Sequence, residues 1–438
     1  MSSPRLQFLT SELDAARAQT DALFSLLDPA ALYHRPVADR HRLIFYRGHV
    51  EAFDWNLLSK HAFQKPSFHP GFDKLFAFGI DPEPGRAPAD QPEDWPSETE
   101  VRGYCSRVRR ELDEALAKLR EHDQDQLLNV AVEHRMMHAE TLAYLFHNLP
   151  YESKREPVGS PNAPVGNSPD YSPKNSLAMH EIPAGLAELG RPSGNGFGWD
   201  NEFERYSIEV PAFRISRFKI SNGEYLAYLR AAGDGTATVR ERPHFWTQRD
   251  GRWFLRAMFG EIPLPLDWPV YVTHHQASEY VRWRSGMEYR NFALPTEAQF
   301  HRASDGASPI NANFERWDPV PVDVGTNGGG GESKHGVAQT IGNGWEWTST
   351  VFAPFPGFQP FPFYPGYSAD FFDGKHFVMK GGSPRTARAL LRPSFRNWFR
   401  ADYPYVYAGF RVVENAVNRG EVAVRHGESV VEDSEAAV

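Results

Sequence analysis

The chain of 438 residues contains a single cysteine, Cys105. An internal disulfide is therefore impossible, and a metal cluster built on several cysteine ligands is excluded. The sequence also lacks an excess of positive charge, since 47 Lys and Arg face 56 Asp and Glu, which leaves a formal net charge of −9. This balance argues against nucleic acid or an anionic membrane as the primary partner and favours small-molecule ligands.

Long apolar segments are absent as well. No run of 18 apolar residues occurs, and the N-terminal stretch MSSPRLQFLTSELDAARAQ has no apolar signal core. We therefore expect a cytoplasmic protein with no membrane partner. The length exceeds the size over which a single hydrophobic core keeps growing, so two or more domains are expected.

The character of the chain changes near residue 150. Residues 1–150 carry four helix signals, which predict a four-helix bundle. These signals are a run ending at Leu27 with Thr10 or Ser11 as its N-cap, a run around residues 38–60, a run from about Ser97 to Glu121, and a run ending near Asn148. Residues 151–176 are rich in Pro, Ser and Asn and are predicted to form a linker.

Residues 177–414 show short strand signals, frequent Gly and Pro and many aromatic residues, with helix signals at 222–232 and 276–286. The chain is therefore predicted to be α+β, with a helical domain followed by a mixed one. In the stretch GNGWEW, we expect Gly342 and Gly344 to serve turns while Trp345 and Trp347 fill the core. Residues 415–438 form a charged tail without aromatic residues.

Two histidines stand four residues apart on the predicted helix EHRMMHAETLAYLF. His134 and His138 fall on its inward stripe, so both imidazoles project in the same direction. His49 lies on the inward face of the run at 38–60 and supplies a third candidate ligand. Imidazole suits zinc, iron, copper or nickel, whereas the alternative is a set of core histidines hydrogen-bonded to backbone or carboxylate.

Eight short motifs in the second half follow one another in a recognisable order: IPAGLAELG, FGWDNE, SNGEYLAYL, PVYVTHHQASEYVRWR, ALPTEAQF, GNGWEWTST, VMKGGSP and AGFRVV. This series resembles the formylglycine-generating-enzyme-like domain, also called the sulfatase-modifying factor domain. The resemblance implies an irregular α+β fold related to C-type lectins. The parent enzyme binds copper with a pair of cysteines, so a chain whose single cysteine lies in the other domain is not expected to perform that chemistry.

The first half, with His49, His134 and His138, resembles the DinB-like bundle. Together the two halves resemble the ergothioneine-biosynthesis sulfoxide synthases and their relatives over residues 10–413. That resemblance implies an oxygen-dependent enzyme with one iron(II) on the three histidines. Its partners would be O2, hercynine, which is the trimethylated betaine of histidine, and a sulfur or selenium donor that is joined to C2 of the imidazole.

The stretch SFRNWFRADYPYVYAGFR resembles the substrate-binding segment of that family. Asn397 and Trp398 match the pair that contacts hercynine. Phe399 and Tyr403 stand where mycobacterial-type members carry Asp and Arg for the donor, and Met137 stands where Gln is common. Loss of both charges resembles the selenoneine synthase branch, in which a selenosugar would stack on aromatic side chains.

Several alternatives stay open. A cysteine or γ-glutamylcysteine donor would need Arg86, Arg396 or Arg400 to bind its carboxylate. The family also implies a tyrosine near the metal, and Tyr364 is our candidate catalytic residue, although Tyr367, Phe361 or Phe363 could occupy that position and each tyrosine could simply pack. Two other functions are a small-molecule binder stabilised by zinc and a thiol transferase of the DinB type.

Overall fold

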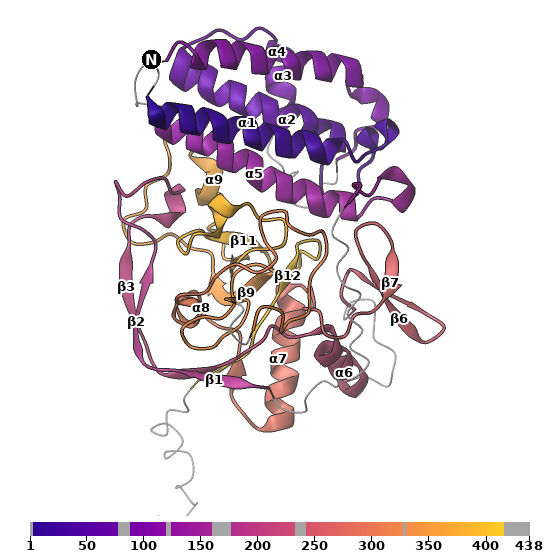
Figure 1. Ribbon diagram of the computed structural model, residues 1–438, viewed down its shortest axis with the longest axis vertical. Helices are drawn as coiled ribbons and strands as arrows, with labels where there is room; N and C mark the ends of the chain where they lie inside the picture. Colours follow the sequence, from indigo (N-terminus) through magenta and orange to yellow (C-terminus); the bar gives the residue numbers. More distant parts are fainter. Residues whose placement is uncertain are drawn as a thin grey trace, which may run out of the picture.

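The computed structural model describes residues 3–77, 88–119, 124–159, 177–232, 242–326 and 330–415. Arg86, most of the predicted linker and the predicted tail after Asn415 lie outside the described residues. A layer of helices covers one side of a mixed helix and strand domain (Figure 1). Within the described ranges, no helix combines the length and the apolar character that crossing a bilayer requires.

The N-terminal domain is a bundle of four long helices, and a short helix, α3, lies beside α2. Their bounds are α1 Pro4–Phe24, α2 Leu43–Leu58, α3 Pro70–Leu75, α4 Glu98–Leu116 and α5 Asp125–His147. Helix α5 packs against α1 and α2, and α2 packs against α4. The predicted bundle is present.

The start of α1 differs from the prediction. Ser3 caps the helix by accepting a hydrogen bond from the backbone N–H of Leu6, and Pro4 occupies the first turn, where proline needs no backbone donor. Thr10 instead donates to the carbonyl of Leu6 inside the helix. The expectation of an N-cap at Thr10 or Ser11 is therefore wrong, because the serine and proline upstream already satisfy the helix end.

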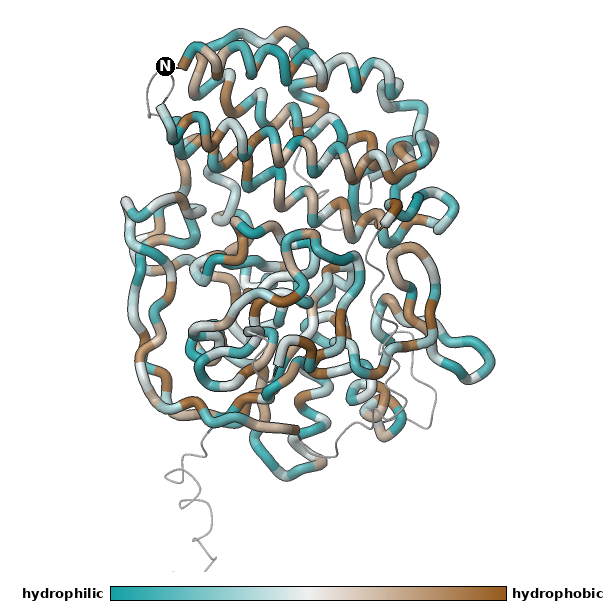
Figure 2. Tube along the Cα trace, viewed as in Figure 1, coloured by the Kyte–Doolittle hydropathy of each residue, from teal (hydrophilic) through white to brown (hydrophobic). Residues whose placement is uncertain are grey.

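Helix α5 is buried over most of its circumference between Leu127 and His147. A helix that is apolar on nearly every side has neighbours on nearly every side. Figure 2 shows apolar segments on α5 and on the part of the C-terminal domain below it, while Figure 1 shows α5 as the bundle helix next to that domain. Helix α5 is thus the element shared by both domains.

The C-terminal domain has two four-stranded sheets, in the orders β1-β4-β13-β8 and β11-β10-β9-β12, together with a β2-β3 hairpin and a β5-β6-β7 sheet. The strands are β1 Met179–Ile182, β2 Gly185–Leu189, β3 Tyr206–Val210, β4 Phe213–Ser216, β5 Trp246–Arg249, β6 Arg252–Arg256, β7 Glu261–Pro263, β8 Phe292–Ala293, β9 Trp345–Val351, β10 His376–Lys380, β11 Asn397–Arg400, β12 Ala408–Gly409 and β13 Val413–Asn415. The helices are α6 Asn222–Ala232, α7 His274–Glu288, α8 Glu297–Ser304 and α9 Gly366–Ala369. The α+β prediction is confirmed.

The GNGWEW stretch has the structural role expected of it. Gly342 and Gly344 adopt φ values of 87° and 117°, which favour glycine, and Trp345 and Trp347 are 2% and 0% exposed. The intervening Glu346 is also fully buried and accepts hydrogen bonds from Lys219 at 2.6 Å and from Arg411 at 2.8 Å. Burial of this carboxylate is tolerated because two cations surround it.

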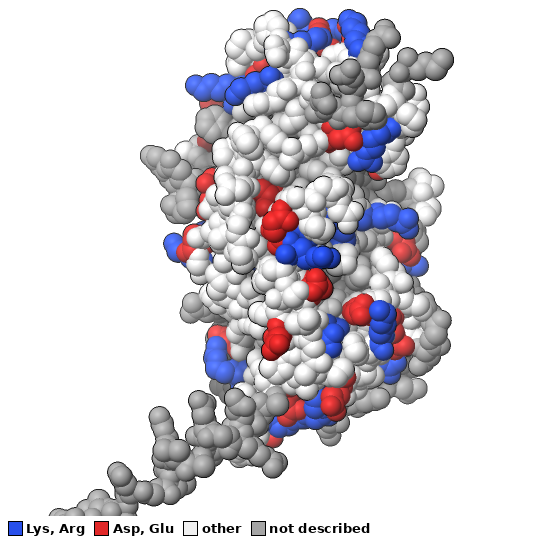
Figure 3. Space-filling view, turned by 90° about the vertical axis from the view of Figure 1, so that its left-hand side faces the viewer, with Lys and Arg blue, Asp and Glu red and all other residues white. Residues whose placement is uncertain are grey.

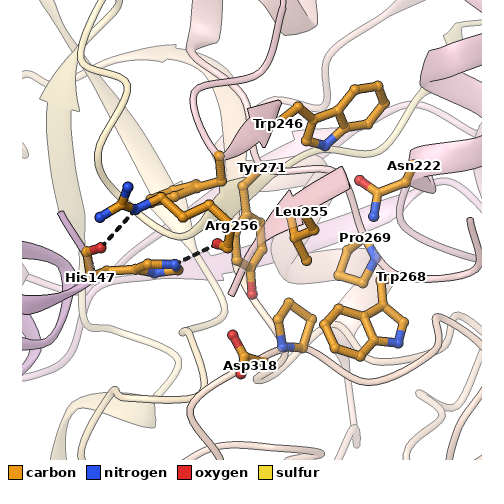
Figure 4. A pocket seen from close by; sticks show the side chains of 11 residues that line it. His147, Asn222, Trp246, Leu255, Arg256, Trp268, Pro269, Tyr271 and Asp318 are labelled. Atoms are coloured by element: carbon orange, nitrogen blue, oxygen red, sulfur yellow. Dashed lines mark hydrogen bonds between the residues drawn. The ribbon is translucent and has the colours of Figure 1, made fainter. Parts of the chain in front are cut away.

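Polar contacts tie α5 to the C-terminal domain along its length. Glu140 accepts hydrogen bonds from the indole of Trp345 at 2.7 Å and from the hydroxyls of Ser383 and Thr386 at 2.5 and 2.8 Å. Near the helix end, the imidazole of His147 donates to the carbonyl of Arg256, and the Arg256 guanidinium donates back to the carbonyl of His147 (Figure 4). The two domains therefore meet through specific hydrogen bonds.

Surface charge is mixed. On the face drawn in Figure 3, blue and red side chains alternate and no region of one sign covers the domain boundary. A surface of this kind produces no strong field that would steer a charged macromolecule to that face.

Candidate metal centre and adjoining pocket

The structure brings the three predicted histidine ligands together. His49 comes from α2, while His134 and His138 come from adjacent turns of α5. The Nε2 atom of His138 lies 3.1 Å from Nε2 of His49 and 3.2 Å from Nε2 of His134. The three side chains are at most 5% exposed, so their nitrogens converge in the dry interior of the bundle.

The orientation of His49 is set by the backbone of the α3 region. Its Nδ1 lies 2.6 Å from the carbonyl oxygen of Phe76, and a carbonyl can only accept, so Nδ1 carries the proton. Nε2 of His49 therefore presents a lone pair to the other two rings. Phe76 approaches this closely because residue 48 is glycine: a Cβ there would lie 2.5 Å from the Phe76 ring.

Aromatic packing and charge complete the surroundings of the three imidazoles. The ring of Phe53 stacks on His134 with centroids 3.4 Å apart. Arg135, which is fully buried, forms ion pairs with Glu51 and Asp54 on α2 and so locks the two ligand-bearing helices together. Desolvation lowers the pKa of His49 to about 4 and lowers the pKa of His134 and His138 well below 6.5.

These features fit a bound cation. At neutral pH all three imidazoles are uncharged, which is the form that ligates metals. His138 can donate a proton from Nε2 to at most one neighbour, so the set leaves lone pairs facing one another at 3.1–3.2 Å. A cation held by His49, His134 and His138 would remove that repulsion.

The predicted tyrosine loop reaches this centre from the C-terminal domain. The ring of Tyr364 lies 6.4 Å from that of His134 and 5.4 Å from that of Phe53. Burial, together with the charge of Asp200, raises the pKa of Tyr364 to about 12. Phe361 and Phe363 stack on each other instead, with centroids 5.0 Å apart, so Tyr364 is the better candidate for a phenol beside the metal.

Tyr367 and Met137 meet across the domain boundary. The Tyr367 hydroxyl donates to Sδ of Met137 at 3.4 Å, and Met137 directly precedes the ligand His138. The edge of Tyr367 also faces Trp398, with ring centroids 5.4 Å apart. The predicted hercynine residue Trp398 is thereby connected to the segment that carries His138 through two side chains, Tyr367 and Met137.

Asn397 and Trp398 lie on strand β11, and both are half-buried. One face of the Trp398 indole is covered by Phe352, which stacks on it at 4.1 Å and 7°. Oδ1 of Asn397 accepts from the backbone N–H of Trp398, and in the described part of the chain Nδ2 of Asn397 has no hydrogen-bond acceptor. The pair therefore offers an amide donor and the remaining surface of an indole.

Phe399 and Tyr403 stack on each other with centroids 5.0 Å apart. The Tyr403 hydroxyl accepts a hydrogen bond from Nε of Arg40 at 2.9 Å, and the Arg40 guanidinium also lies 5.2 Å from the Tyr403 ring centroid. Arg40 is 4% exposed, and its charge is among the causes that lower the pKa of His138. The predicted donor region thus contains a cation from the bundle.

Sequence reasoning missed Arg40, Phe76 and Phe53. Gly48 was a usable signal for a close approach, because an isolated glycine inside a helical pattern is often there for packing. Two arginines considered for the donor carboxylate are placed elsewhere: Arg396 is 2% exposed and bonded to Glu297, and Arg400 is about half exposed near Asp402. Arg86 lies outside the described residues.

A cavity of about 20 Å³ lies beside the C-terminal end of α5 and is lined by His147, Trp246, Arg256, Tyr271 and Asp318 among others (Figure 4). That volume suffices for about one water molecule. Its lining includes none of the residues predicted to bind metal or substrate. This cavity is therefore separate from the candidate metal centre around the three histidines.

The comparison with known proteins agrees with this architecture. Residues 12–145 match the DinB superfamily, and residues 167–416 match the sulfatase-modifying factor enzyme 1-like domain. A DinB-like bundle that carries three histidines against a sulfatase-modifying factor domain defines the class of protein.

Individual relatives define it further. The chain is 30% identical to ergothioneine biosynthesis protein 1 of Schizosaccharomyces pombe, over 89% of this chain and 54% of that protein, and 26% identical to its namesake in Neurospora crassa, over 89% and 56%. It is 30% identical to hercynine oxygenase of Mycobacterium tuberculosis, over 72% of this chain and 78% of that enzyme. The chain belongs to the ergothioneine-biosynthesis sulfoxide synthase family. It spans about half the length of the two fungal relatives.

The histidine set can be tested by metal content. Replacing His49, His134 or His138 by Ala should reduce bound iron(II) to about a tenth or less of the wild-type content, because two imidazoles seldom hold a divalent ion alone. His61→Ala, which removes an exposed histidine of the same domain, is the matched control and should keep full metal content. Elemental analysis after anaerobic loading measures the result, and a His134→Ala protein with full iron would contradict the assignment.

Low pH should destabilise the metal-free protein. Because burial lowers the pKa of His49 from 6.5 to about 4, the unfolded chain takes up a proton at pH values where the folded chain does not. Stability should be complete above about pH 6.5 and fall by on the order of 3 kcal/mol from this residue as the pH drops to about 4. Urea unfolding across this range measures the slope, which should be flatter in His49→Gln. Equal slopes in both proteins would refute the idea.

Proposed function

We propose that this protein is an oxygen-dependent non-heme iron enzyme that joins a selenium donor, a selenosugar, to C2 of the imidazole of hercynine. The observation that carries the proposal is the position of the three-histidine centre. It lies at the domain boundary, with the ring of Tyr364 6.4 Å from that of His134, and Met137 and Tyr367 connect it to Trp398. The names of the relatives, which refer to hercynine and to ergothioneine biosynthesis, support the choice of acceptor.

The redox balance explains why such a reaction needs oxygen. Joining C2 of hercynine to the donor replaces a C–H bond and a Se–H bond by one C–Se bond, which releases two protons and two electrons. O2 accepts four electrons, so oxidation of the selenium to a selenoxide supplies the other two, and one oxygen atom ends in that product and the other in water. Iron(II) bound by the histidines would supply the oxygen activation, whereas zinc with the same ligands would not.

Hercynine would bind on the C-terminal side of the centre. Its trimethylammonium group suits the indole surface of Trp398, an attraction of about 0.5–2 kcal/mol, while Nδ2 of Asn397 can donate to its carboxylate or imidazole. Tyr367 lies between Trp398 and Met137 and contacts both. With a thioether at residue 137 in place of an amide, that wall is less polar than the one implied by the family resemblance.

The donor region supports a neutral selenosugar through its aromatic surface. Phe399 and Tyr403 form a stacked pair where an acidic and a basic side chain were expected from the family resemblance. A sugar ring can pack on such a surface and does not need an ion pair. The ammonium group of γ-glutamylcysteine, in contrast, would lose its carboxylate partner, which contributes on the order of 1.5–3 kcal/mol.

Arg40 favours a second candidate function, an ergothioneine-type synthase that uses cysteine or γ-glutamylcysteine. The guanidinium of Arg40 lies at Tyr403, close to the position of the missing arginine, and could bind a donor carboxylate from the bundle side. The two candidates share hercynine, iron and oxygen. They differ in whether the donor carries a carboxylate for Arg40.

Tyr364 is the side chain we propose as the phenol that delivers a proton or an electron during bond formation. Its ring approaches His134 closely, and its raised pKa keeps the hydroxyl protonated at neutral pH, which is the state a proton donor requires. Without this phenol, oxygen would still be consumed, but the electrons would be drawn from the donor alone.

Donor competition tests the proposed function. With iron(II), hercynine and O2 held constant, kcat/KM for the selenosugar should exceed that for cysteine or γ-glutamylcysteine by about a hundredfold, since two ionic contacts are missing. Arg40→Met should leave the selenosugar value within about threefold, whereas it would lower the value for a carboxylate donor by about tenfold or more. Arg42→Met, which breaks an ion pair with Asp90, is the matched control.

The outcomes separate the candidates. Efficient use of γ-glutamylcysteine with loss in Arg40→Met would establish the second candidate. If the protein consumes no oxygen with either donor and binds zinc tightly, the result would instead favour a zinc-stabilised binding protein.

Removal of the Tyr364 hydroxyl should change the product. In Tyr364→Phe, formation of the C–Se or C–S bond should fall by about a hundredfold, within the usual contribution of a general acid, while oxidation of the donor without hercynine continues. Product analysis by mass spectrometry against total oxygen uptake measures this partition. Tyr206→Phe, which changes a tyrosine on strand β3, should behave like the wild type. An unchanged partition in Tyr364→Phe would exclude Tyr364 from the reaction.

A further inference from the structure

The segment Trp199–Glu202, part of the FGWDNE motif, is a fully buried and largely polar segment at the domain boundary. Its four residues are between 0% and 1% exposed. None of them was predicted to bind metal or substrate. Three of the four are polar or charged, so the burial of their side chains must be offset by specific partners.

On one side these partners belong to the metal-binding helix. The indole Nε1 of Trp199 donates to Oε2 of Glu133 at 2.8 Å, and Glu133 directly precedes the ligand His134. The guanidinium of Arg392 donates to both oxygens of Glu133, at 2.7 and 2.9 Å, and also to Glu202. The segment is thus fastened to α5 by a carboxylate, arginine and carboxylate bridge as well as by the indole.

On the other side the partners belong to the tyrosine loop. The ring of Trp199 stacks on Tyr367 with centroids 3.9 Å apart and an angle of 25°. The next two residues hold the neighbour of Tyr367: the hydroxyl of Ser368 donates to Asp200, and the amide of Asn201 donates to that hydroxyl at 2.9 Å. Three consecutive residues of the segment, 199–201, therefore contact two consecutive residues of the loop, Tyr367 and Ser368.

The loop depends on contacts from other segments because it contains only a short helix of its own. Helix α9 has four residues, Gly366–Ala369, which is far below the length at which a helix is stable by itself. Tyr364 precedes it and makes two backbone hydrogen bonds, from its N–H to the carbonyl of Phe361 and from the N–H of Tyr367 to its own carbonyl, both within the loop. Figure 1 shows α9 next to α5, at the boundary between the domains.

We propose that Trp199, Asp200, Asn201 and Glu202 are positioning residues that fix Tyr364 and Tyr367 relative to the three-histidine centre. The segment contacts α5 at Glu133 and the loop at Tyr367 and Ser368, so the position of the loop depends on the position of the helix. The functional half of this inference rests on the proposed function, because it assigns the segment the task of holding the phenol of Tyr364 beside His134. The structural half stands on the contacts alone.

The test uses the full-length protein loaded with iron(II) and two variants that act on different contacts. Trp199→Phe keeps an aromatic face for Tyr367 but removes the hydrogen bond to Glu133. Ser368→Ala removes the contacts to Asp200 and Asn201 without changing either tyrosine. The matched controls are Trp283→Phe on helix α7 and Ser349→Ala, an exposed serine of strand β9.

Hydrogen exchange of the backbone amides is the first readout, because it requires no turnover. In both variants the amides of residues 361–371 should exchange about tenfold faster than in the wild type, while those of residues 125–147 keep their rates. Both controls should match the wild type throughout. Unchanged exchange in residues 361–371 of either variant, or equal acceleration across α5, would overturn the inference.

Turnover is the second readout and addresses the role in the reaction. In both variants kcat for bond formation should fall about tenfold, with KM for hercynine and for the donor changed less than about threefold, and more of the oxygen should be consumed without coupled product. Faster hydrogen exchange with an unchanged kcat and an unchanged ratio of product formed to oxygen consumed would refute the role of the segment in the reaction. If the wild type shows no turnover at all, the proposed function fails, whereas the exchange data still decide whether the segment positions the loop.

Discussion

The convergence of three uncharged imidazoles inside a dry helical interface is the constraint on which the rest of the structure depends. Nε2 of His138 lies 3.1 Å from Nε2 of His49 and 3.2 Å from Nε2 of His134, and a cation among the three rings would remove the repulsion between their lone pairs. The sequence around His49 serves that geometry: Gly48 admits the ring of Phe76, and the carbonyl of Phe76 selects the tautomer. The ion pairs of Arg135 then hold α2 and α5 at the distance that the ligands need.

Helix α5 explains why the metal centre and the second domain are neighbours. Glu133, Met137 and Glu140 recur with helical spacing and contact the C-terminal domain, while His134 and His138 follow one residue after the first two of them. Adjacent stripes of a single helix thus carry two candidate metal ligands and contact the C-terminal domain. Any shift of that domain along α5 would move the tyrosine loop relative to the histidines.

The donor region shows how the loss of two charges can be offset from another part of the chain. The family resemblance led us to expect an acidic and a basic side chain where Phe399 and Tyr403 now stack. Arg40, which lies in the segment before α2, places a guanidinium cation beside this pair, and its Nε donates a hydrogen bond to the Tyr403 hydroxyl. Two residues 363 positions apart in the sequence, Arg40 and Tyr403, therefore meet in the predicted donor region.

Helical periodicity in the sequence was sufficient to identify His49, His134 and His138, because the direction of a side chain on a helix depends on local spacing alone. The bundle, the α+β character and the turn glycines of GNGWEW could also be predicted from local pattern and composition, whereas the cap of α1 was missed because a serine and a proline further upstream begin the helix. The roles of Arg40, Phe76 and Trp199 were decided by tertiary structure. Each acts through a partner distant in sequence, and no local pattern states which loops will meet once the apolar faces of two domains are buried together.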